Sequence, residues 1–457
     1  MYRFYINNID DDYHYMELAR VFLPDDGFET IAYSGKPVAH LLGSDSFFVN
    51  EKGSDDREEI KREFYELLSC ITGMRPPWGT LTGVRPLKPA LEICRESSVD
   101  EMECIIREKY LMSEKKASLI SGIADYQLSH VSGIPWEKAS MYIGIPFCPT
   151  RCAYCSFASN VAPAEEREKY ISNLLKEVTC AGRLAEENGT ELESIYIGGG
   201  TPTTLSSEQL ESLIIRVSEA FHIDPAELEF TVEAGRPDTI TKNKLDTLKS
   251  LGISRISINP QSMKDETLKL IGRDHSADDI REGFRIARET GFDVINADLI
   301  AGLPEENVDD FEASLREMIG LKAENITIHT LSVKRGSRLR DNDPGYYRQN
   351  AERVSAMLDL SRKMLSSAGY RPYYIYRQKH QIGALENVGW CLPGKHSLYN
   401  IRIMEDKQTV IGLGAGAVGK VYHPEEDRLE RIANVSNYRI YSERFDDMIS
   451  RKKEYYK

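Results

Sequence analysis

From residue 140 onward, short β-rich runs alternate with longer amphipathic stretches, and this alternation constrains the fold more than any other feature. The expected strands cover residues 141–147, 194–199, 229–234, 255–259, 294–300 and 325–331. The expected helices cover residues 164–188, 206–221, 239–250, 276–290, 307–322 and 347–368. Helix-sized connections between strands are typical of parallel βαβ units. Six such units predict an α/β fold with a partial (β/α)6 TIM-like barrel; a doubly wound open sheet is the structural alternative.

The two ends of the chain follow other patterns. Residues 1–137 combine strand-like pieces with helical patterns at 57–70, 86–96, 99–110 and 113–130. This mixture predicts an N-terminal α+β accessory domain. We expect residues 138–369 to form the partial barrel and residues 370–457 to form a C-terminal extension that covers the barrel mouth.

Net charge and cysteine content limit the partners and the compartment that we expect for the protein. The 457 residues carry a formal net charge of −14, which disfavours nucleic acid and anionic membranes as partners. The sequence shows no signal-peptide pattern and no apolar stretch long enough to span a bilayer. Only 8 cysteines occur, so a disulfide scaffold is disfavoured. We therefore expect a cytoplasmic protein.

Three of the cysteines, Cys148, Cys152 and Cys155, lie within eight residues of one another. Four thiolates saturate a [4Fe-4S] cluster, so a cluster held by three keeps one iron open to another ligand. A structural zinc site is the alternative, and it needs a fourth Cys or His. The nearest candidates, His130 and Cys180, belong to no paired motif. The three cysteines therefore favour an iron–sulfur cluster that takes part in chemistry.

Other unusual residues fall where the expected strands end, which is where barrels of this kind place their functional groups. After the cysteine loop come residues 198–203, Glu233, Gln261, Asp298, residues 302–304 and residues 332–338. Glycines 198–200 let the backbone approach a ligand closely, so that its amides and carbonyls can bind the polar ends of an amino acid. A tight turn without a ligand is the alternative.

Two carboxylates occur in these β-like apolar runs. Burying Glu233 or Asp298 is costly unless the carboxylate is paired or bound to a ligand. A ribose diol or an ammonium group is a suitable ligand. For a purely structural role, Arg236 or Arg255 is the expected partner.

The cysteine spacing, with an aromatic residue before the last cysteine, resembles the signature of the radical S-adenosylmethionine enzymes. This resemblance implies that the cofactor's methionine amino and carboxylate groups occupy the open iron, and that cleavage of a carbon–sulfur bond gives a 5′-deoxyadenosyl radical. Segments 141–157, 198–205, 255–275 and 298–304 are more specifically similar to the oxygen-independent coproporphyrinogen III oxidase family. Within that family the chain is closest to the HemZ branch.

The resemblance implies site residues position by position. Cys148, Cys152 and Cys155 would hold the [4Fe-4S] cluster. The S-adenosylmethionine site would be lined by Tyr142, Gly199, Gly200, Thr201, Glu233, Gln261, Arg273 and Asp298, with Thr330 or Ser332 on the adenine side. Family members that bind a second cofactor molecule use the aromatic residue at Tyr154 and a tail residue, which Val418 matches. No separate catalytic side chain is predicted.

Three features depart from the family or compete with it. Well-known oxidases have a further cysteine two residues after the third, where this chain has Phe157. Gly144 replaces a histidine usual in the family, so that histidine's roles cannot be transferred here. Residues 412–419 are rich in glycine and resemble a dinucleotide loop, but a close-packing turn is favoured because no helix pattern follows.

The family implies oxidative decarboxylation of coproporphyrinogen III propionates to vinyl groups, giving protoporphyrinogen IX, with an electron donor as partner. The carboxylates of this porphyrinogen substrate need local cations. The sequence offers Lys334, Arg335, Arg338, Arg340, Arg371, Arg377 and Lys379, for which a solvated charged loop is the alternative. A haem-binding chaperone and another radical tetrapyrrole enzyme are the competing functions.

Overall fold

The computed structural model describes residues 1–34, 45–94, 97–155, 157, 159–332, 350–378 and 384–455. Its contacts divide the chain into two compact units. One unit comprises Met1–Ser129 with Ile375–Lys379, and the other comprises His130–Tyr374 with His380–Lys457. A short piece of the tail thus belongs to the N-terminal unit. The three-part division at residues 137 and 369 stays a prediction.

The N-terminal unit contains a three-stranded parallel sheet and several helices. Its strands, in the order β2-β1-β3, are β1 (Tyr2–Asn7), β2 (Phe28–Tyr33) and β3 (Ser46–Val49). The helices are α1 (Tyr13–Phe22), α2 (Arg57–Thr72), α3 (Leu87–Ile93), α4 (Val99–Tyr110) and α5 (Glu114–His130). The core includes Phe4 and Phe64, whose ring centroids lie 5.0 Å apart. The predicted mixture of strands and helices is confirmed.

The second unit contains the predicted parallel strands, which pair in chain order. They are β4 (Ala139–Ile145), β5 (Leu192–Gly199), β6 (Glu229–Glu233), β7 (Arg255–Ser257), β8 (Val294–Ala301) and β9 (Asn325–Thr330). The strands alternate buried apolar residues, such as Ile195 and Ile197 of β5, with polar or aromatic ones, such as Ser194 and Tyr196. The (β/α)6 arrangement is confirmed.

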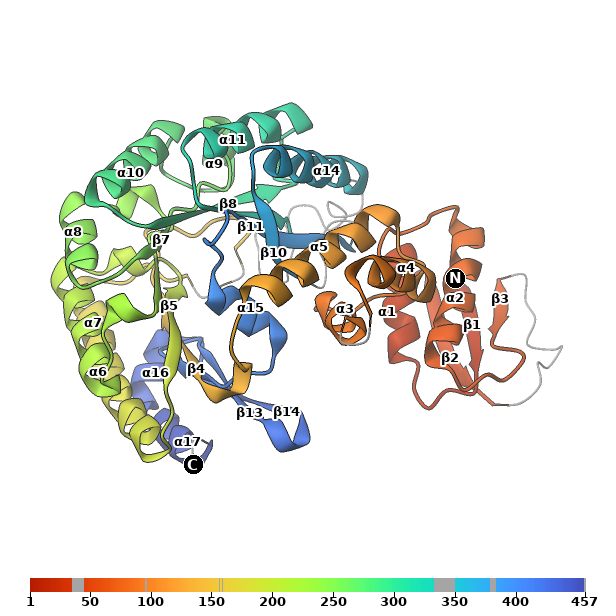
Figure 1. Cartoon of the computed structure of the whole chain (residues 1–457), viewed down its shortest axis with the longest axis horizontal. Helices are drawn as coiled ribbons and strands as arrows, with labels where there is room; N and C mark the ends of the chain where they lie inside the picture. Colours follow the sequence, from red (N-terminus) through yellow and green to blue (C-terminus); the bar gives the residue numbers. More distant parts are fainter. Residues whose placement is uncertain are drawn as a thin grey trace. The chain divides into compact units, whose positions relative to one another are not determined.

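The predicted connecting helices are also present, and Figure 1 shows several of them following one another around the outside of the strands. They are α6 (Ala164–Glu187), α7 (Ser207–Phe221), α8 (Lys242–Ser250), α10 (Ala277–Thr290), α11 (Val308–Gly320) and α14 (Ala351–Ser367). Capping boxes at Ser206, Ser276 and Asn307 fix the start of three of them. A short helix, α9 (Asp265–Leu270), was not predicted.

Further strands extend the sheet on both sides, so that β4 and β9 do not pair. Beside β9 lie β11 (Glu386–Cys391) and then β10 (Arg371–Arg377). Beside β4 lie β12 (Val410–Leu413), β13 (Val418–His423) and β14 (Arg428–Ala433). The barrel is therefore open, as a partial barrel must be. The glycine-rich segment at 412–419 is the turn of the β12–β13 hairpin, in agreement with the close-packing alternative.

One helix closes the amino end of the strands. The helix α15 (Leu398–Glu405) begins where the Glu229 carboxylate, at the start of β6, accepts hydrogen bonds from Ser397 Oγ (2.9 Å), Leu398 N (2.7 Å) and Tyr399 N (2.9 Å). The Tyr399 ring then stacks on Tyr196 with centroids 4.8 Å apart.

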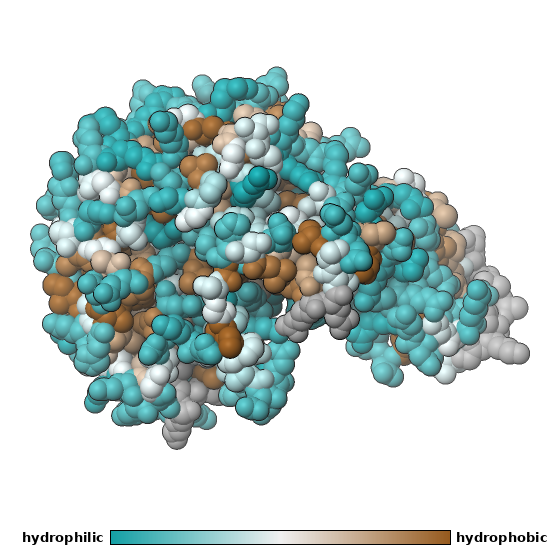
Figure 2. Space-filling view, viewed as in Figure 1, coloured by the Kyte–Doolittle hydropathy of each residue, from teal (hydrophilic) through white to brown (hydrophobic). Residues whose placement is uncertain are grey.

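The C-terminal helices α16 (Tyr438–Glu443) and α17 (Phe445–Tyr455) pack on α6. Lys452 Nζ lies 2.8 Å from Glu177 Oε1, and both side chains are buried. On the face shown in Figure 2, hydrophilic side chains predominate and hydrophobic ones are scattered. Among the described residues, we find no helix with the length and apolar character needed to cross a bilayer.

Candidate functional site

The carboxyl ends of β4 to β9 bring most of the predicted site residues to one rim. The cysteine loop follows β4, and Gly199 ends β5. Glu233 ends β6, Gln261 follows β7, and Asp298 lies in β8. Because neighbouring parallel strands place these ends side by side, residues far apart in sequence meet here.

Backbone hydrogen bonds fix the cysteine loop to other connections of the rim. Cys148 N donates to Asn160 O (3.0 Å), and Ala153 N donates to Ile271 O (2.9 Å). Thr150 Oγ1 donates to the carbonyl of Gly272 (3.0 Å). The loop is therefore held at both ends of its cysteine motif.

The sulfurs of Cys148 and Cys152 have polar side chains beside them. Thr201 Oγ1 lies 3.6 Å from Cys148 Sγ, and Arg236 Nη1 lies 3.7 Å from Cys152 Sγ. Burial raises the pKa of the Cys148 thiol to about 11 and also raises the pKa of Cys155. Thiols of this kind give up their protons when a metal centre binds.

The donor set fits a multi-iron cluster. The charges of Cys148, Cys152 and Cys155 influence one another, so the three thiols share one region. Yet within the described ranges no three His, Cys, Asp or Glu side chains are placed to chelate a metal ion. A cluster binds each cysteine through a different iron, so its sulfurs stand farther apart than the ligands of one ion. Three thiols in one region fit the ligand set of a [4Fe-4S] cluster that keeps one iron open.

The glycine triplet packs directly against the cysteine loop. Gly200 N donates to Ile145 O and Thr201 N donates to Phe147 O, both at 2.7 Å. A Cβ on Gly200 would lie 2.5 Å from Phe147 O and 3.0 Å from Cys148 Sγ, so only glycine fits. Sequence reasoning expected both amides and carbonyls here to face a ligand. These two amides instead hold the loop, which leaves backbone carbonyls as the groups suited to an ammonium.

Glu233 is half-buried and has no arginine partner among the described residues. Tyr196 Oη donates to its Oε1 at 2.6 Å. Burial raises the pKa of Glu233 to about 7, and the nearby charge of Asp298 adds to this effect. Arg236 pairs with Asp238 instead, and Arg255 lies 3.8 Å from Glu229. The structural alternative for Glu233 is therefore wrong, and the carboxylate is suited to a cationic or hydroxyl-bearing ligand.

Asp298 differs from Glu233 because a histidine lies beside it. His329 Nε2 is 3.5 Å from Asp298 Oδ2, and Asn296 Nδ2 donates to Oδ1 at 2.8 Å. Burial raises the pKa of Asp298, but the charge and hydrogen bond of His329 outweigh it and hold the pKa below its usual value. Asp298 therefore stays ionised beside a carboxyl that readily takes a proton.

Gln261 carries an unsatisfied polar atom. Its φ of 69° lies in the left-handed region, and its backbone is fixed by Gln261 N donating to Asp298 O (2.8 Å) and Ile300 N donating to Gln261 O (3.0 Å). Its Oε1 is buried and has no hydrogen-bond partner among the described residues. Orphaned buried acceptors are rare, so this atom indicates a missing ligand.

Aromatic rings line the interior beneath these groups. Tyr142 stacks on Tyr196 and on Tyr399, with centroids 6.3 and 6.4 Å apart. Burial raises the pKa of Tyr142, so its hydroxyl stays protonated. Sequence reasoning found Tyr142 by resemblance but missed Tyr196 and Tyr399. The alternation of β5 could have indicated Tyr196, two residues before the glycine triplet.

Tyr154 and Arg273 are brought together as predicted members of one site. Arg273 Nη2 donates to Tyr154 Oη at 3.1 Å, and Arg273 Nη1 donates to the carbonyl of Asn259 at 2.5 Å. Arg273 is buried and Tyr154 is half-buried, and burial raises the pKa of Tyr154. This guanidinium is therefore fixed next to the cysteine loop.

The remaining predicted residues lie farther from this cluster of contacts. Thr330 is tied to β11, since its N donates to Asn387 Oδ1 and its Oγ1 to Glu386 O, each at 2.7 Å. Ser332 directly follows β9. Val418 begins β13, two strands beyond β4, and is 41% exposed. Their cofactor roles stay predictions.

The predicted substrate cations are mostly outside the described residues. This applies to Lys334, Arg335, Arg338, Arg340 and Lys379. Arg371 is exposed at the start of β10. Arg377 belongs to the N-terminal unit, where it donates to Leu81 O and lies 5.2 Å from the ring centroid of Trp78. Arg377 is thus already engaged by its own unit.

The packing around Gly144 explains why this chain has a glycine where the family usually has a histidine. A Cβ at this position would lie 2.9 Å from Ala415 O, and one on Gly414 would lie 2.4 Å from Gly144 O. The β12–β13 turn therefore occupies the space that a side chain at 144 would need. Phe157, at the other departure, is 64% exposed.

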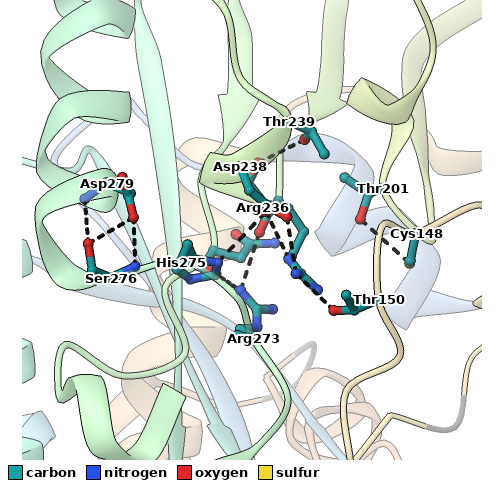
Figure 3. Close-up of polar contacts among 12 residues, drawn as sticks. Cys148, Thr150, Thr201, Arg236, Asp238, Thr239, Arg273, His275, Ser276 and Asp279 are labelled. Atoms are coloured by element: carbon teal, nitrogen blue, oxygen red, sulfur yellow. Dashed lines mark hydrogen bonds and ion pairs between the residues drawn. The ribbon is translucent and has the colours of Figure 1, made fainter. Parts of the chain in front are cut away.

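A polar cluster beside the cysteine loop was missed from the sequence. Figure 3 shows Arg236, Asp238 and His275 converging near Thr150. Asp238 is flanked by Arg236 Nε at 3.1 Å and by His275 Nδ1 at 3.8 Å. Burial raises the pKa of Asp238, but the hydrogen bond of His275 and the charge of Arg236 lower it to about 2. The position of Arg236 just after a strand end was the available signal.

Comparison with known proteins agrees with this geometry. Residues 142–318 match the radical SAM superfamily. The oxygen-independent coproporphyrinogen-III oxidase-like protein HemZ of Bacillus subtilis is 39% identical over 404 residues, or 87% of this chain and 81% of that protein. The heme chaperone HemW of Bacillus subtilis is 32% identical over 282 residues, or 62% of this chain and 71% of that protein.

A solved structure supports the fold. Coproporphyrinogen III oxidase (HemN) from Escherichia coli aligns with a TM-score of 0.54 at 21% identity, covering 69% of this chain and 71% of that chain. Radical SAM proteins use a [4Fe-4S] cluster and S-adenosylmethionine, so the predicted cofactors are confirmed. The chain belongs to the radical SAM superfamily, in the family of the oxygen-independent coproporphyrinogen III oxidase-like protein HemZ.

Proposed function

We propose that this chain converts propionate side chains of coproporphyrinogen III to vinyl groups. The observation that carries the proposal is its similarity to HemZ, which extends over 87% of the chain and includes the regions outside the barrel. The rim supports it with three cysteines, the half-buried carboxyl groups of Glu233 and Asp298, and the unsatisfied amide oxygen of Gln261 in one region. Such a site suits a bound cofactor more than a structural role.

When bound, the cluster and S-adenosylmethionine supply a carbon-centred radical that can remove a hydrogen atom. Each propionate then loses one hydrogen atom, one electron and carbon dioxide to leave a vinyl group. An electron donor must reduce the cluster, and an acceptor must take the substrate's electron. The proposal specifies the electron donor and the electron acceptor only by their chemical class.

In this proposal the chain's own residues bind and orient. Cys148, Cys152 and Cys155 hold the cluster. Glu233, with its readily acquired proton, and the ionised Asp298 offer two different acceptors for the polar groups of the cofactor. Tyr142 and the rings packed on it keep water from the interior beneath them.

Haem binding without turnover is the second candidate. It is favoured by the relatives described as heme chaperones, including the 32% identical HemW protein. It is also favoured by Phe157, which stands where well-known oxidases have a further cysteine. The two candidates share the cluster site and differ in what happens to the tetrapyrrole.

One anaerobic experiment separates the candidates. Reconstituted full-length protein is incubated with S-adenosylmethionine, a reductant, an electron acceptor and coproporphyrinogen III, and the products are analysed by mass spectrometry. Vinyl products, with loss of carbon dioxide from the substrate mass, support the oxidase. Stoichiometric haem binding with no change in coproporphyrinogen supports the chaperone, and methylated or ring-opened products support another radical enzyme.

A further inference from the structure

Arg236 lies behind the cysteine loop, at a position to which the family resemblance gives no role. It follows Glu233 by three residues and is only 3% exposed. Its Nη1 lies 3.7 Å from Cys152 Sγ, and its Nη2 donates to Thr150 Oγ1 at 3.0 Å (Figure 3). The guanidinium therefore contacts the loop at a sulfur and at a hydroxyl two residues away.

A carboxylate fixes the orientation of this guanidinium. Arg236 Nε and Nη2 donate to the two oxygens of Asp238, at 3.1 and 3.2 Å. This paired geometry restricts the plane of the guanidinium more than a single bond would. With Nε and Nη2 committed to Asp238 and Thr150, Nη1 is the group directed at the Cys152 sulfur.

The other nearby cation, Arg273, has different main partners. Arg273 uses Nη1 for the carbonyls of Asn259 and Gly235, at 2.5 and 3.4 Å, and Nη2 for Tyr154. Arg273 also interacts with the Cys152 thiol, whereas Arg236 Nη1 contacts that sulfur at 3.7 Å in hydrogen-bonding geometry. Burial makes its charge more effective, since the interior screens electrostatic interactions less than water does.

We propose that Arg236 is a positioning residue for the iron–sulfur cluster, which holds the Cys152 sulfur and makes the cluster easier to reduce. Hydrogen bonds to cluster sulfurs and nearby positive charge stabilise the more negative, reduced state. The inference rests on the proposed assignment of the three cysteines as cluster ligands. It does not depend on the porphyrinogen reaction, so either can fail alone.

The test is the reduction potential of the cluster, measured without substrate. Full-length wild type, Arg236→Gln, Arg236→Lys and Arg255→Gln are reconstituted anaerobically and titrated with dithionite while the reduced cluster is followed by electron paramagnetic resonance. Arg255 is the matched control because it is a buried arginine at the amino end of β7, away from the rim. Iron content is measured for every sample.

Arg236→Gln should lower the equilibrium constant for reduction at least threefold, or about 30 mV at 59 mV per tenfold change. Arg236→Lys should lower it less, and Arg255→Gln should leave it unchanged. Wild-type potential and full iron content in Arg236→Gln would overturn the proposal. If the glutamine variant does not fold, Arg236→Lys decides, and an unchanged potential there would overturn it. Absence of iron in the wild type would instead remove the cluster assignment itself.

Discussion

The rim of the barrel has two chemically different sides. Glu233 and Arg236 lie on different sides, although they are only three positions apart in the chain. On the cysteine-loop side, the buried cations Arg236 and Arg273 surround thiols whose pKa is raised by burial. On the interior side, the half-buried carboxyl groups of Glu233 and Asp298 lie next to a tyrosine and a histidine. Arg236 and Glu233 have no hydrogen-bond partner in common among the described residues.

This difference indicates what each side is built to hold. A cluster bound by three thiolates is electron-rich and is stabilised by cations and N–H donors. An amino acid ammonium and a ribose diol are stabilised by acceptors, which the interior side provides. A sulfonium nucleoside bridging the two sides would satisfy both, and the predictions below change one side at a time.

The largest effect is expected for Cys152→Ser. Without this sulfur the cysteine-loop side loses a ligand, so iron content should fall severalfold and any cofactor-dependent turnover should drop to background, at least 1000-fold. Iron and sulfide analysis after anaerobic reconstitution measures this. Cys104→Ser, at an exposed cysteine of the N-terminal unit, is the control. Equal iron content in both variants would contradict the assignment.

A raised carboxyl pKa could be particular to the ligand-binding side of the rim or could follow from burial alone. The pH dependence of the free energy of unfolding tests this at Glu306. Glu306 is buried in the loop after β8 and bonded to Ser262, and burial raises its pKa to about 7, as for Glu233. The folded protein keeps this proton up to about pH 7, whereas the unfolded chain releases it near 4.5. The free energy of unfolding therefore falls as pH rises from about 5 to 7.

Glu306→Gln should remove that fall, so its stability relative to wild type should increase by up to about 3 kcal/mol between pH 5 and 7.5. Urea unfolding of the metal-free protein at both pH values measures the difference. The exposed neighbour, Glu305→Gln, should show no such change. A constant difference between Glu306→Gln and wild type across this range would show that Glu306 is ionised in the folded protein.

Two alanine substitutions in the glycine triplet address the two sides separately. Gly200→Ala places a Cβ 2.5 Å from Phe147 O, next to the cysteine loop, whereas Gly198→Ala places one 2.8 Å from the Tyr196 ring and 3.1 Å from Glu233 Oε1. Each should lower stability by about 1–3 kcal/mol. Gly200→Ala should mainly reduce iron content, and Gly198→Ala should mainly weaken S-adenosylmethionine binding. Identical losses in both variants would mean that the sides are not separable.

The smallest effects are expected at Glu233 and its partner Tyr196, and we consider Glu233→Gln first. The amide keeps the shape of the carboxyl but cannot carry a negative charge, so S-adenosylmethionine should bind about tenfold more weakly, or about 1.4 kcal/mol. Equilibrium dialysis with the reconstituted protein measures this affinity. Tyr196→Phe removes the hydroxyl that donates to Glu233 and should have a smaller effect. Unchanged binding in Glu233→Gln would exclude this residue from the cofactor site.

Local sequence signals predicted the barrel well because strands and helices follow short-range patterns. Ser206, Ser276 and Asn307 supply their own caps, so three helix starts could be placed within one residue. The added strands β10 to β14 were not predicted; two of them join the barrel strands through partners far away in sequence, β11 with β9 and β12 with β4. Pairing of this kind depends on tertiary contacts that no local pattern contains.

The site was predicted only in part, because local patterns locate its residues but tertiary contacts decide their partners. The cysteine spacing and the strand ends identified Cys148, Glu233, Gln261 and Asp298 as one region. The hydrogen-bond partners in this region were not predictable. The paired hydrogen bonds from Arg236 to Asp238 and the hydrogen bond from Tyr196 to Glu233 form only in the folded chain. The amides of residues 200 and 201 were assigned to a ligand because their true acceptors lie some 54 residues earlier.

The most direct test of the account is electron paramagnetic resonance of the reduced, reconstituted protein with and without S-adenosylmethionine, together with metal analysis. The account predicts about four iron atoms per chain and a cluster signal that changes shape when the cofactor is added, because one iron has no cysteine ligand. Stoichiometric zinc without iron, or an iron signal that is identical with and without S-adenosylmethionine, would contradict it.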